Sequence, residues 1–308
     1  MMGPLLPSTM QKIEDAYDVH RYWESNDKDK LLKSIEGSCE GVVTDGGTGV
    51  SADVLKQLPN VRIVSVFGVG VDAVDLEYCQ NQSIKVGNTP DVLSDDVADL
   101  AVALALACCR RLVNCDTYAR SGLWATQGAM PLTTRMTGKR AGIFGLGSIG
   151  ASLAKRLEGF GMSIKYCNRS QRSDIPYEYV ASLEMLAESV DFLFVTASAS
   201  GDALKAINSK VLEKLGPAGY LINVSRGTLV DESALISALK QNHIAGAGLD
   251  VFADEPHIPE SLQKLENVVL QPHHASGTTE TREAMGQLVI DNLAAHFSGE
   301  PLVTPVLP

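Results

Sequence analysis

Three apolar segments in the second half of the chain lead directly into side chains that could perform acid–base chemistry or bind anions. Arg226 follows the segment LINVS, and His273 follows VVLQP. Asp250 and Glu255 lie within LDVFADEP. If these segments are parallel strands, their carboxyl ends share one rim, where such sheets bind ligands. Reduction of a 2-oxo acid needs a cation that binds the carboxylate and polarises the ketone, and an acid that protonates the new alkoxide. A glutamate near the histidine would favour imidazolium, so the sequence predicts Arg226, Glu255 and His273 as one catalytic group.

Two adjacent histidines, His273 and His274, follow the last of these segments, and only one is expected to transfer a proton. Histidine is the side chain most easily poised near neutral pH. Adjacent residues of a strand point to opposite faces, so the two rings should not share one task. Spacing alone does not choose between them, and a hydrogen-bonded structural histidine is the alternative for each.

A glycine-rich turn between a strand and a helix predicts a dinucleotide site. The segment AGIFG leads into G-x-G-x-x-G at residues 145–150, and the helix that follows has an apolar face. In this context the first glycine permits a tight turn and the second lets the backbone approach a pyrophosphate. The third lets the helix pack close to the sheet, with its N-terminus facing the phosphates. The alternative is a turn that binds no ligand. The predicted contact residues are Gly145, Gly147, Ser148, Ile149 and Gly150.

The next strand end lacks the acid that an NAD site carries about 20 residues further on for the ribose hydroxyls. It reads CNRSQR. Arg169 and Arg172 would attract a 2′-phosphate that a carboxylate would repel, and Ser170 could donate a hydrogen bond to it. Together with Asn168, these residues predict a preference for NADP(H) over NAD(H). Two alternatives stay open: the arginines are solvated surface residues, or Asp174, past the turn, is the competing acid.

Short apolar runs alternate with amphipathic helical segments along the chain, which is the pattern of βαβ units and parallel sheets. We therefore predict an α/β fold with two Rossmann-like, doubly wound domains and a cleft between them. A flavodoxin-like substrate domain would comprise residues 1–94 plus 279–308, and an NADP-binding Rossmann domain residues 95–278. The predicted strands are 41–44, 61–67, 84–86, 141–147, 163–168, 191–198, 219–226, 246–252 and 267–273.

Three other segments carry specific expectations. The apolar segment after Asp95-Asp96-Val97 predicts a long buried helix that crosses between the domains, with acids at its start and arginines at its end, as the helix dipole favours. Residues 126–139 predict a long irregular stretch, either a functional loop or an interface arm. The opening MMGPLLPST resembles the end of a strand that runs into a loop, with a truncated chain or an unusually short first strand as the alternatives.

The composition excludes several classes of partner. With 26 Lys and Arg against 37 Asp and Glu, the formal net charge is −11, and no basic run occurs, so we expect no nucleic acid and no membrane surface. The longest apolar run is too short to span a bilayer, and no signal peptide opens the chain.

The six cysteines show no C-x-x-C motif and no zinc spacing. They predict no metal site and buried free thiols in a reducing compartment, the cytoplasm.

Six segments together resemble the D-isomer-specific 2-hydroxyacid dehydrogenase family over essentially the whole chain. The resemblance implies that Arg226, Glu255 and His273 are the catalytic trio, because the family's histidine directly follows the proline. It also implies that the backbone N–H groups of Val69 and Gly70 bind the substrate carboxylate. The segments are VFGVGVDAVD (66–75), NTPDVLSDDVADLA (88–101), GIFGLGSIG (142–150), NVSRGTLVDE (223–232), GLDVFADEP (248–256) and QPHHASGT (271–278).

The same resemblance implies further roles at the cofactor and at a subunit interface. Asp250 is expected near the nicotinamide carboxamide, with a turn or cap role as the alternative. The segment Thr196–Ser198 is expected to border the adenosine, with Thr196 and Ala197 as contact residues, and Ser225 is expected to contact the cofactor. Trp124 resembles a residue that enters the partner subunit's site, with packing in a dimer interface as the alternative. The resemblance and the long arm therefore predict a homodimer.

Within the family, the arginine-bearing strand end and the closing HFSGEPLVTPV resemble the glyoxylate/hydroxypyruvate and hydroxyphenylpyruvate reductase branch, which favours NADPH. The expected reaction is NADPH-dependent reduction of glyoxylate, hydroxypyruvate or hydroxyphenylpyruvate to the D-2-hydroxy acid. The sequence does not rank these acids, although small residues in DGGTGV (45–50) leave room for an aromatic substrate. The alternatives are a phosphoglycerate-dehydrogenase-like NAD enzyme, which the missing acid opposes, and a non-catalytic, NAD(H)-sensing corepressor-like module.

Overall fold

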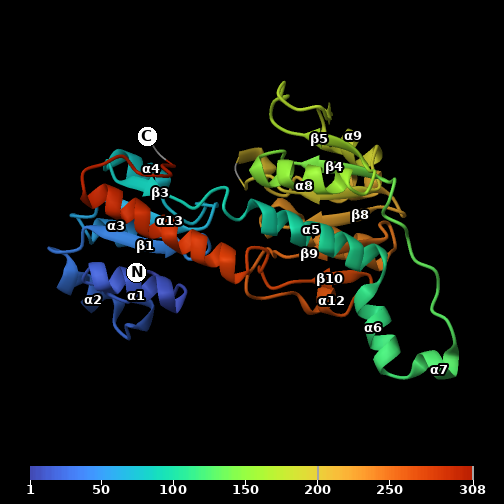
Figure 1. Ribbon diagram of the computed structural model, residues 1–308, viewed down its shortest axis with the longest axis horizontal. Helices are drawn as coiled ribbons and strands as arrows, with labels where there is room; N and C mark the ends of the chain where they lie inside the picture. Colours follow the sequence, from blue (N-terminus) through green and yellow to red (C-terminus); the bar gives the residue numbers. More distant parts are fainter. Residues whose placement is uncertain (200, 307–308) are drawn as a thin grey trace. The chain divides into compact units, whose positions relative to one another are not determined.

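The protein consists of two compact units in a computed structural model that describes residues 1–199 and 201–306 (Figure 1). Unit 1 comprises Met1–Leu93 and Ser276–Pro308, and unit 2 comprises Ser94–Ala275. Each unit has its own parallel sheet and its own core of buried apolar side chains. The α/β class with parallel sheets that the sequence predicts is confirmed.

The sheet of unit 1 has three parallel strands among the described residues, in the order β1-β2-β3. It has fewer strands than the flavodoxin-like sheet that the sequence predicts. The long helix α13 packs on β2, where the Ser65 hydroxyl donates to the Val289 carbonyl at 3.3 Å, and α1 packs against α13. The elements are β1 (Gly41–Asp45), β2 (Ile63–Phe67), β3 (Lys85–Gly87), α1 (Pro7–Ala16), α2 (Lys28–Ile35), α3 (Ala52–Lys56), α4 (Leu76–Asn81) and α13 (Thr279–Phe297).

The N-terminal residues form two backbone hydrogen bonds to other parts of unit 1 and then begin a helix. The Met2 N–H donates to the Val43 carbonyl at 2.8 Å, and the Tyr22 N–H donates to the Met1 carbonyl at 3.0 Å. Helix α1 begins at Pro7, where proline is favoured because the first N–H groups of a helix have no intrahelical partner. The prediction of a loop at this point was wrong, because PST already belongs to the helix. A cavity of about 430 Å³, lined mainly by apolar residues, lies beside β1.

The sheet of unit 2 has seven parallel strands in the described part of the chain, in the order β10-β9-β8-β7-β4-β5-β6. The order reverses between β4 and β7, which is where doubly wound sheets bind their ligands. The sequence predicted six of these strands and missed β6, whose two residues are too few to show a periodic pattern. The strands are β4 (Arg140–Phe144), β5 (Ser163–Cys167), β6 (Glu178–Tyr179), β7 (Phe192–Val195), β8 (Tyr220–Asn223), β9 (Gly246–Leu249) and β10 (Val268–Leu270).

Helices cover both faces of this sheet because its strands are apolar on both faces (Figure 1). Helices α9, α10 and α11 share one apolar core with Ala247 and Leu249 of β9. The neighbouring Gly248 faces the opposite way, toward α5, which packs against α8. The helices are α5 (Ser94–Cys109), α6 (Leu112–Arg120), α7 (Leu123–Gln127), α8 (Ser148–Glu158), α9 (Leu183–Glu188), α10 (Ser209–Leu215), α11 (Glu232–Lys240) and α12 (Glu260–Gln263).

Helix α5 belongs to unit 2 over its whole length, so it does not cross between the units as the sequence suggested. After it, α6 and α7 project away from the sheet of unit 2 and the chain returns without regular structure (Figure 1). This segment, residues 112–139, is called the arm below. Among the described residues, no helix has both the length and the apolar character that a membrane crossing requires.

The close contact between α5 and β9 predicts that no side chain larger than that of glycine fits at Gly248. A Cβ at this position would lie 2.9 Å from the Leu104 Cβ and 3.2 Å from the Cys108 sulfur. We expect Gly248→Ala to lower the free energy of unfolding by about 1–3 kcal/mol, because the helix must move off the sheet. Thermal unfolding measures this as a lower midpoint. Gly37→Ala is the control, since a Cβ there meets no atom within 4 Å; an equal loss in both variants would contradict the prediction.

Candidate active site

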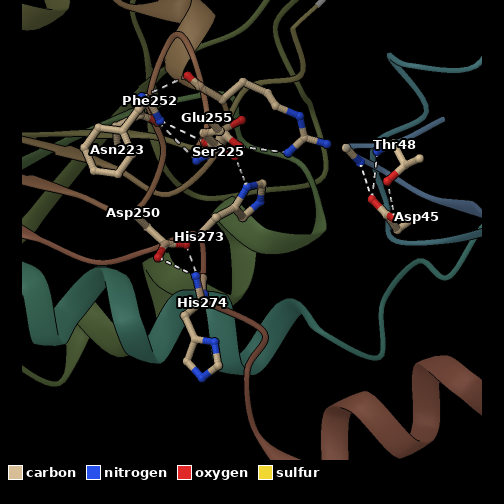
Figure 2. A network of polar contacts seen from close by, with 12 residues as sticks. Asp45, Thr48, Asn223, Ser225, Asp250, Phe252, Glu255, His273 and His274 are labelled. Atoms are coloured by element: carbon tan, nitrogen blue, oxygen red, sulfur yellow. Dashed lines mark hydrogen bonds and ion pairs between the residues drawn. The ribbon is translucent and has the colours of Figure 1, made fainter. Parts of the chain in front are cut away.

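The centre of the candidate site is a short hydrogen bond between His273 and Glu255 (Figure 2). His273 Nδ1 lies 2.6 Å from Glu255 Oε2, and Oε1 accepts the Phe252 N–H at 2.9 Å. Burial raises the pKa of Glu255, but the hydrogen bonds from His273 and Phe252 and the charges of His273 and Arg226 outweigh it, so the pKa lies below its ordinary value. Because an ionised carboxylate only accepts hydrogen bonds, Nδ1 carries the proton. The other ring nitrogen, Nε2, is then the atom that can serve a substrate.

Backbone contacts to Asp250 fix the conformation of the histidine loop. The His273 N–H donates to the Asp250 carbonyl at 2.7 Å, and the Asp250 carboxylate accepts the N–H groups of His274 and Ala275 at 2.7 and 3.0 Å. His273 has a φ of +51°, which is uncommon for a residue with a side chain and often marks functional sites. Because β10 ends at Leu270, the expected strand alternation of the two histidines was wrong.

Asp250 is fully buried, and burial raises the pKa of its carboxyl group against the opposing effect of the two N–H groups. Both carboxylate oxygens serve the histidine loop. The structure therefore shows Asp250 in a turn-forming role. Its contact with a nicotinamide carboxamide stays a prediction.

Arg226 is held at the carboxyl end of β8 by a buried amide that the sequence analysis missed. Asn223 donates from Nδ2 to the Arg226 carbonyl at 2.9 Å and accepts the Ser225 N–H at 3.1 Å. Arg226 Nη1 donates to the Ser225 carbonyl at 2.8 Å. Asn223 has no exposed surface, so its polar atoms are committed to this turn. The sequence feature that could have indicated Asn223 is its position as the polar residue at the end of the apolar run YLIN.

The glycine-rich turn leaves room for a pyrophosphate at the start of α8. A Cβ on Gly147 would meet no atom within 4 Å, whereas one on Gly145, which has a φ of +98°, would lie 2.3 Å from the Ala197 Cα. A Cβ on Gly150 would lie 2.6 Å from the Gly145 carbonyl oxygen. Tight packing around one open stretch of backbone at a helix N-terminus fits a dinucleotide. Gly147 and Ser148 are exposed there, and Ile149 is half-buried.

The ends of β4, β7 and β8 are joined around this turn. The Thr196 hydroxyl donates to the Gly145 carbonyl at 2.7 Å, and the Ser225 hydroxyl donates to the Ala197 carbonyl. These contacts bring the predicted residues Thr196, Ala197 and Ser225 to the same rim as the turn. The turn and the catalytic candidates of unit 2 thus lie at carboxyl ends of one sheet.

The loop after β5 is attached to the glycine-rich turn through Leu146. Asn168 Oδ1 accepts the Leu146 N–H at 2.6 Å, and Arg172 Nη1 donates to the Leu146 carbonyl at 3.0 Å. Arg172 also forms an ion pair with Asp174, the acid considered above as the alternative ligand for the ribose. The other predicted residues of this loop are exposed: Arg169 and Ser170.

In unit 1, Val69 and Gly70 lie in the loop after β2. The Gly68 N–H donates to the Thr89 hydroxyl at 3.0 Å, and Asn88 Nδ2 donates to the Val69 carbonyl at 2.8 Å. Val69 is 38% exposed, so this backbone is reachable from solvent. Its role in binding a carboxylate stays a prediction.

The segment 45–50, expected to face the substrate, is a turn organised by Asp45. Its carboxylate accepts the N–H groups of Gly47 and Thr48, both at 2.8 Å, and the Thr48 hydroxyl at 2.6 Å (Figure 2). An aspartate that binds the backbone two and three residues onward is a common turn device. The small residues therefore form an ordered turn.

Comparison with known proteins decides the family. Residues 102–275 match the family described as D-isomer specific 2-hydroxyacid dehydrogenase, NAD binding domain. The chain belongs to the D-isomer-specific 2-hydroxyacid dehydrogenase family. This confirms the resemblance drawn from the six sequence segments and establishes a nicotinamide dinucleotide as the cofactor of this 2-hydroxyacid dehydrogenase.

Relatives of this dehydrogenase match over the full chain. It is 46% identical to the glyoxylate/hydroxypyruvate reductase A of Arabidopsis thaliana and to the hydroxyphenylpyruvate reductase of Plectranthus scutellarioides, with 100% of this chain and 98% of each relative covered. An NADPH-dependent glyoxylate/hydroxypyruvate reductase from Sinorhizobium meliloti, solved with NADP and malonate, superposes with a TM-score of 0.93. That match has 41% identity and covers 99% of this chain and 94% of the other.

The lowered pKa of Glu255 predicts a pH dependence of the dehydrogenase's stability. Because folding lowers the pKa of Glu255 from 4.5, the stabilising contribution of Glu255 is present above pH 4.5 and is lost as pH falls through the lower, folded value. Unfolding midpoints of the wild type and Glu255→Gln should therefore differ at neutral pH and converge below pH 4.5. Glu260→Gln, which removes an exposed pair with Lys264, is the control. A Glu255→Gln difference that stays constant with pH would count against the pair.

Proposed function

We propose that this chain reduces a small 2-oxo acid to the D-2-hydroxy acid and prefers NADPH to NADH. The observation that carries this proposal is the 2.6 Å His273–Glu255 pair, on the same sheet as the glycine-rich turn, in a chain of this family. The names of the plant relatives support a 2-oxo acid substrate. So does the 2-ketogluconate reductase of Gluconobacter oxydans, to which the chain is 41% identical over 99% of its length.

The proposed mechanism assigns one task to each side chain. A nicotinamide dinucleotide, held at the glycine-rich turn, would supply the hydride that reduces C2 of the acid. His273 Nε2 donates the proton that completes the new hydroxyl, and Glu255 holds the ring in place by accepting the hydrogen bond from Nδ1. Arg226 neutralises the substrate carboxylate and polarises the carbonyl. We assign the backbone N–H groups of Val69 and Gly70 to the same carboxylate.

The proposed NADP(H) preference rests on the loop after β5. Asn168 stands where an NAD site would carry an acid, and its side-chain oxygen accepts the Leu146 N–H. Arg169 and Ser170 are exposed, and Arg172 presents a guanidinium beside the glycine-rich turn. Arginine forks and hydroxyl groups suit a 2′-phosphate. The NADP complex of the Sinorhizobium meliloti reductase supports this preference.

The test is a rate measurement with both reduced cofactors. Loss of reduced-nicotinamide absorbance is followed with glyoxylate, hydroxypyruvate, 4-hydroxyphenylpyruvate and 2-ketogluconate, with pyruvate as a control. Higher kcat/KM with NADPH for one of the four acids supports the proposal. Higher kcat/KM with NADH and a phosphorylated acid would favour the phosphoglycerate-dehydrogenase-like alternative, and no turnover would favour the corepressor-like one.

His273→Asn should lower kcat by about 10²–10⁴-fold, because the proton donor is removed while the cofactor site is intact. Binding of NADPH, measured by fluorescence, should persist in this variant. His274→Asn is the matched control and should retain most of the turnover, since only its backbone contacts Asp250. Equal losses in the two variants would remove the distinction between the histidines.

We further propose that the arm forms a homodimer. Its large apolar side chains are exposed in the single chain: Leu112 (51%), Val113 (57%), Trp124 (70%) and Leu132 (101%). Several such side chains on one projecting segment are typical of an interaction surface. The two roles considered for Trp124, in the partner's site and in interface packing, both require this dimer.

Introducing charge into the arm should split the dimer. We expect Leu132→Asp combined with Val113→Asp to give a monomer in light scattering, because buried carboxylates without partners are strongly unfavourable. Met185→Asp is the control, since Met185 is 60% exposed on α9, outside the arm. A wild-type monomer would overturn the proposal.

A cytoplasmic location completes the proposal. All six cysteines are free thiols. Burial raises the pKa of Cys79 to about 11 and that of Cys108 to about 12, so both stay protonated at neutral pH. Free thiols are typical of a reducing compartment.

A further inference from the structure

The position of Arg172 is fixed by the folded chain independently of Asp174. The backbone N–H of Arg172 donates to the Tyr166 hydroxyl at 2.8 Å, and that hydroxyl donates to the backbone carbonyl of Arg172 at 3.3 Å. Tyr166 is fully buried on β5 and packs against Tyr179. Arg172 Nη1 is anchored to the Leu146 carbonyl within the glycine-rich turn. The guanidinium therefore stands beside the strand end at which a dinucleotide fold holds the adenosine ribose.

Asp174 binds the Nε–Nη2 edge of the same guanidinium. Arg172 Nε donates to Asp174 Oδ1 at 3.0 Å, and Nη2 donates to Oδ2. Two parallel bonds from one guanidinium are also the arrangement in which arginine binds a phosphate. The hydrogen bonds from Arg172 lower the pKa of Asp174, so the carboxylate is charged at neutral pH. The Arg172 and Asp174 side chains are 34% and 63% exposed, so a ligand can reach this fork from solvent.

We propose that Asp174 is a specificity-determining residue that competes with the cofactor's 2′-phosphate for the Nε–Nη2 fork of Arg172. This inference rests on the NADP(H) preference proposed above. A 2′-phosphate must displace the carboxylate, or bind beside it against the repulsion of two anions. NAD(H) carries no such phosphate and meets neither cost. Asp174 thus weakens the binding of NADP(H) selectively and keeps the preference moderate.

The contacts distinguish this competitor from an acid that binds ribose hydroxyls. Both Asp174 oxygens already accept hydrogen bonds from Arg172, which leaves them poorly placed to bind a ribose. Arg172 keeps its bonds to Tyr166 and Leu146 when the Asp174 charge is removed. Loss of the charge should therefore release the fork and leave the guanidinium in position.

The first test is Asp174→Asn, which preserves the shape of the side chain and removes its charge. We expect the Kd for NADPH to fall about three- to tenfold and the Kd for NADH to change by less than about twofold, as the interaction of solvent-exposed charges suggests. Calorimetry at fixed ionic strength measures both values. Adenosine 2′,5′-bisphosphate and 5′-AMP give the same comparison without the nicotinamide. Glu188→Gln on α9 is the matched control. It also removes one negative charge from an exposed ion pair, in this case with Lys214.

Arg172→Gln separates failure of this inference from failure of the NADP(H) preference. In the Arg172→Gln background, NADPH should bind more weakly and Asp174→Asn should have no further effect. If Asp174→Asn alone leaves NADPH binding unchanged or weakens it, the competition is overturned while the preference stands. Weaker NADH binding in Asp174→Asn would make Asp174 the ribose acid, which also overturns it. If the wild type binds NADH more tightly and Arg172→Gln changes neither Kd, the preference itself fails.

Discussion

The rim of unit 2 that holds Arg226, Glu255 and His273 depends on the buried carboxylate of Asp250. A charged group without exposed surface is tolerated only when hydrogen bonds replace its water. The backbone N–H groups of His274 and Ala275 donate such hydrogen bonds to the Asp250 carboxylate. The backbone carbonyl of Asp250 accepts a further hydrogen bond from the His273 N–H. These contacts tie the loop to the end of β9 and compensate the unusual φ of His273. The ring then meets Glu255, which lies five residues after Asp250 in the chain.

A neutral amide plays the corresponding part at the end of β8. Asn223 folds the chain back so that Arg226 leaves the strand in a defined direction. The two devices are connected, because the Asp250 N–H donates to the Asn223 carbonyl at 2.9 Å and the Gln271 N–H donates to the Leu249 carbonyl at 2.8 Å. The backbone ladder therefore reaches Asp250 and Gln271, one residue past the ends of β9 and β10. The loops that hold Arg226, Glu255 and His273 begin from these tied strand ends.

Much of this arrangement could be predicted from the sequence, because it follows from patterns with a fixed period. Apolar runs that end in polar residues indicated parallel strands with reactive ends, and the glycine spacing indicated the turn before α8. What escaped prediction depends on contacts in three dimensions that no periodic pattern in the sequence records. The φ of His273 is set by Asp250, which lies 23 positions earlier in the chain. Strand β6 has two residues, and its place in the sheet comes from pairing with β5. The pairing of Arg172 with Asp174 needs a turn shape that composition does not show.

The carboxylates of Glu255 and Asp174 differ in how firmly each is held, and this difference suits the tasks proposed for them. Glu255 is bound from two directions, by the His273 ring and the Phe252 N–H, and its side chain is 33% exposed. A carboxylate held in this way stays with its partner, as the ring-orienting role proposed for Glu255 requires. Asp174 is 63% exposed and is held chiefly by Arg172. An exposed pair of this kind stabilises the fold little, so an incoming anion can exchange with the carboxylate at small cost. In a chain with a net charge of −11, Glu255 and Asp174 each hold a nitrogen-bearing side chain in position for the anionic ligand proposed to bind there. Of the two carboxylates, only the more exposed Asp174 is open to displacement by that ligand.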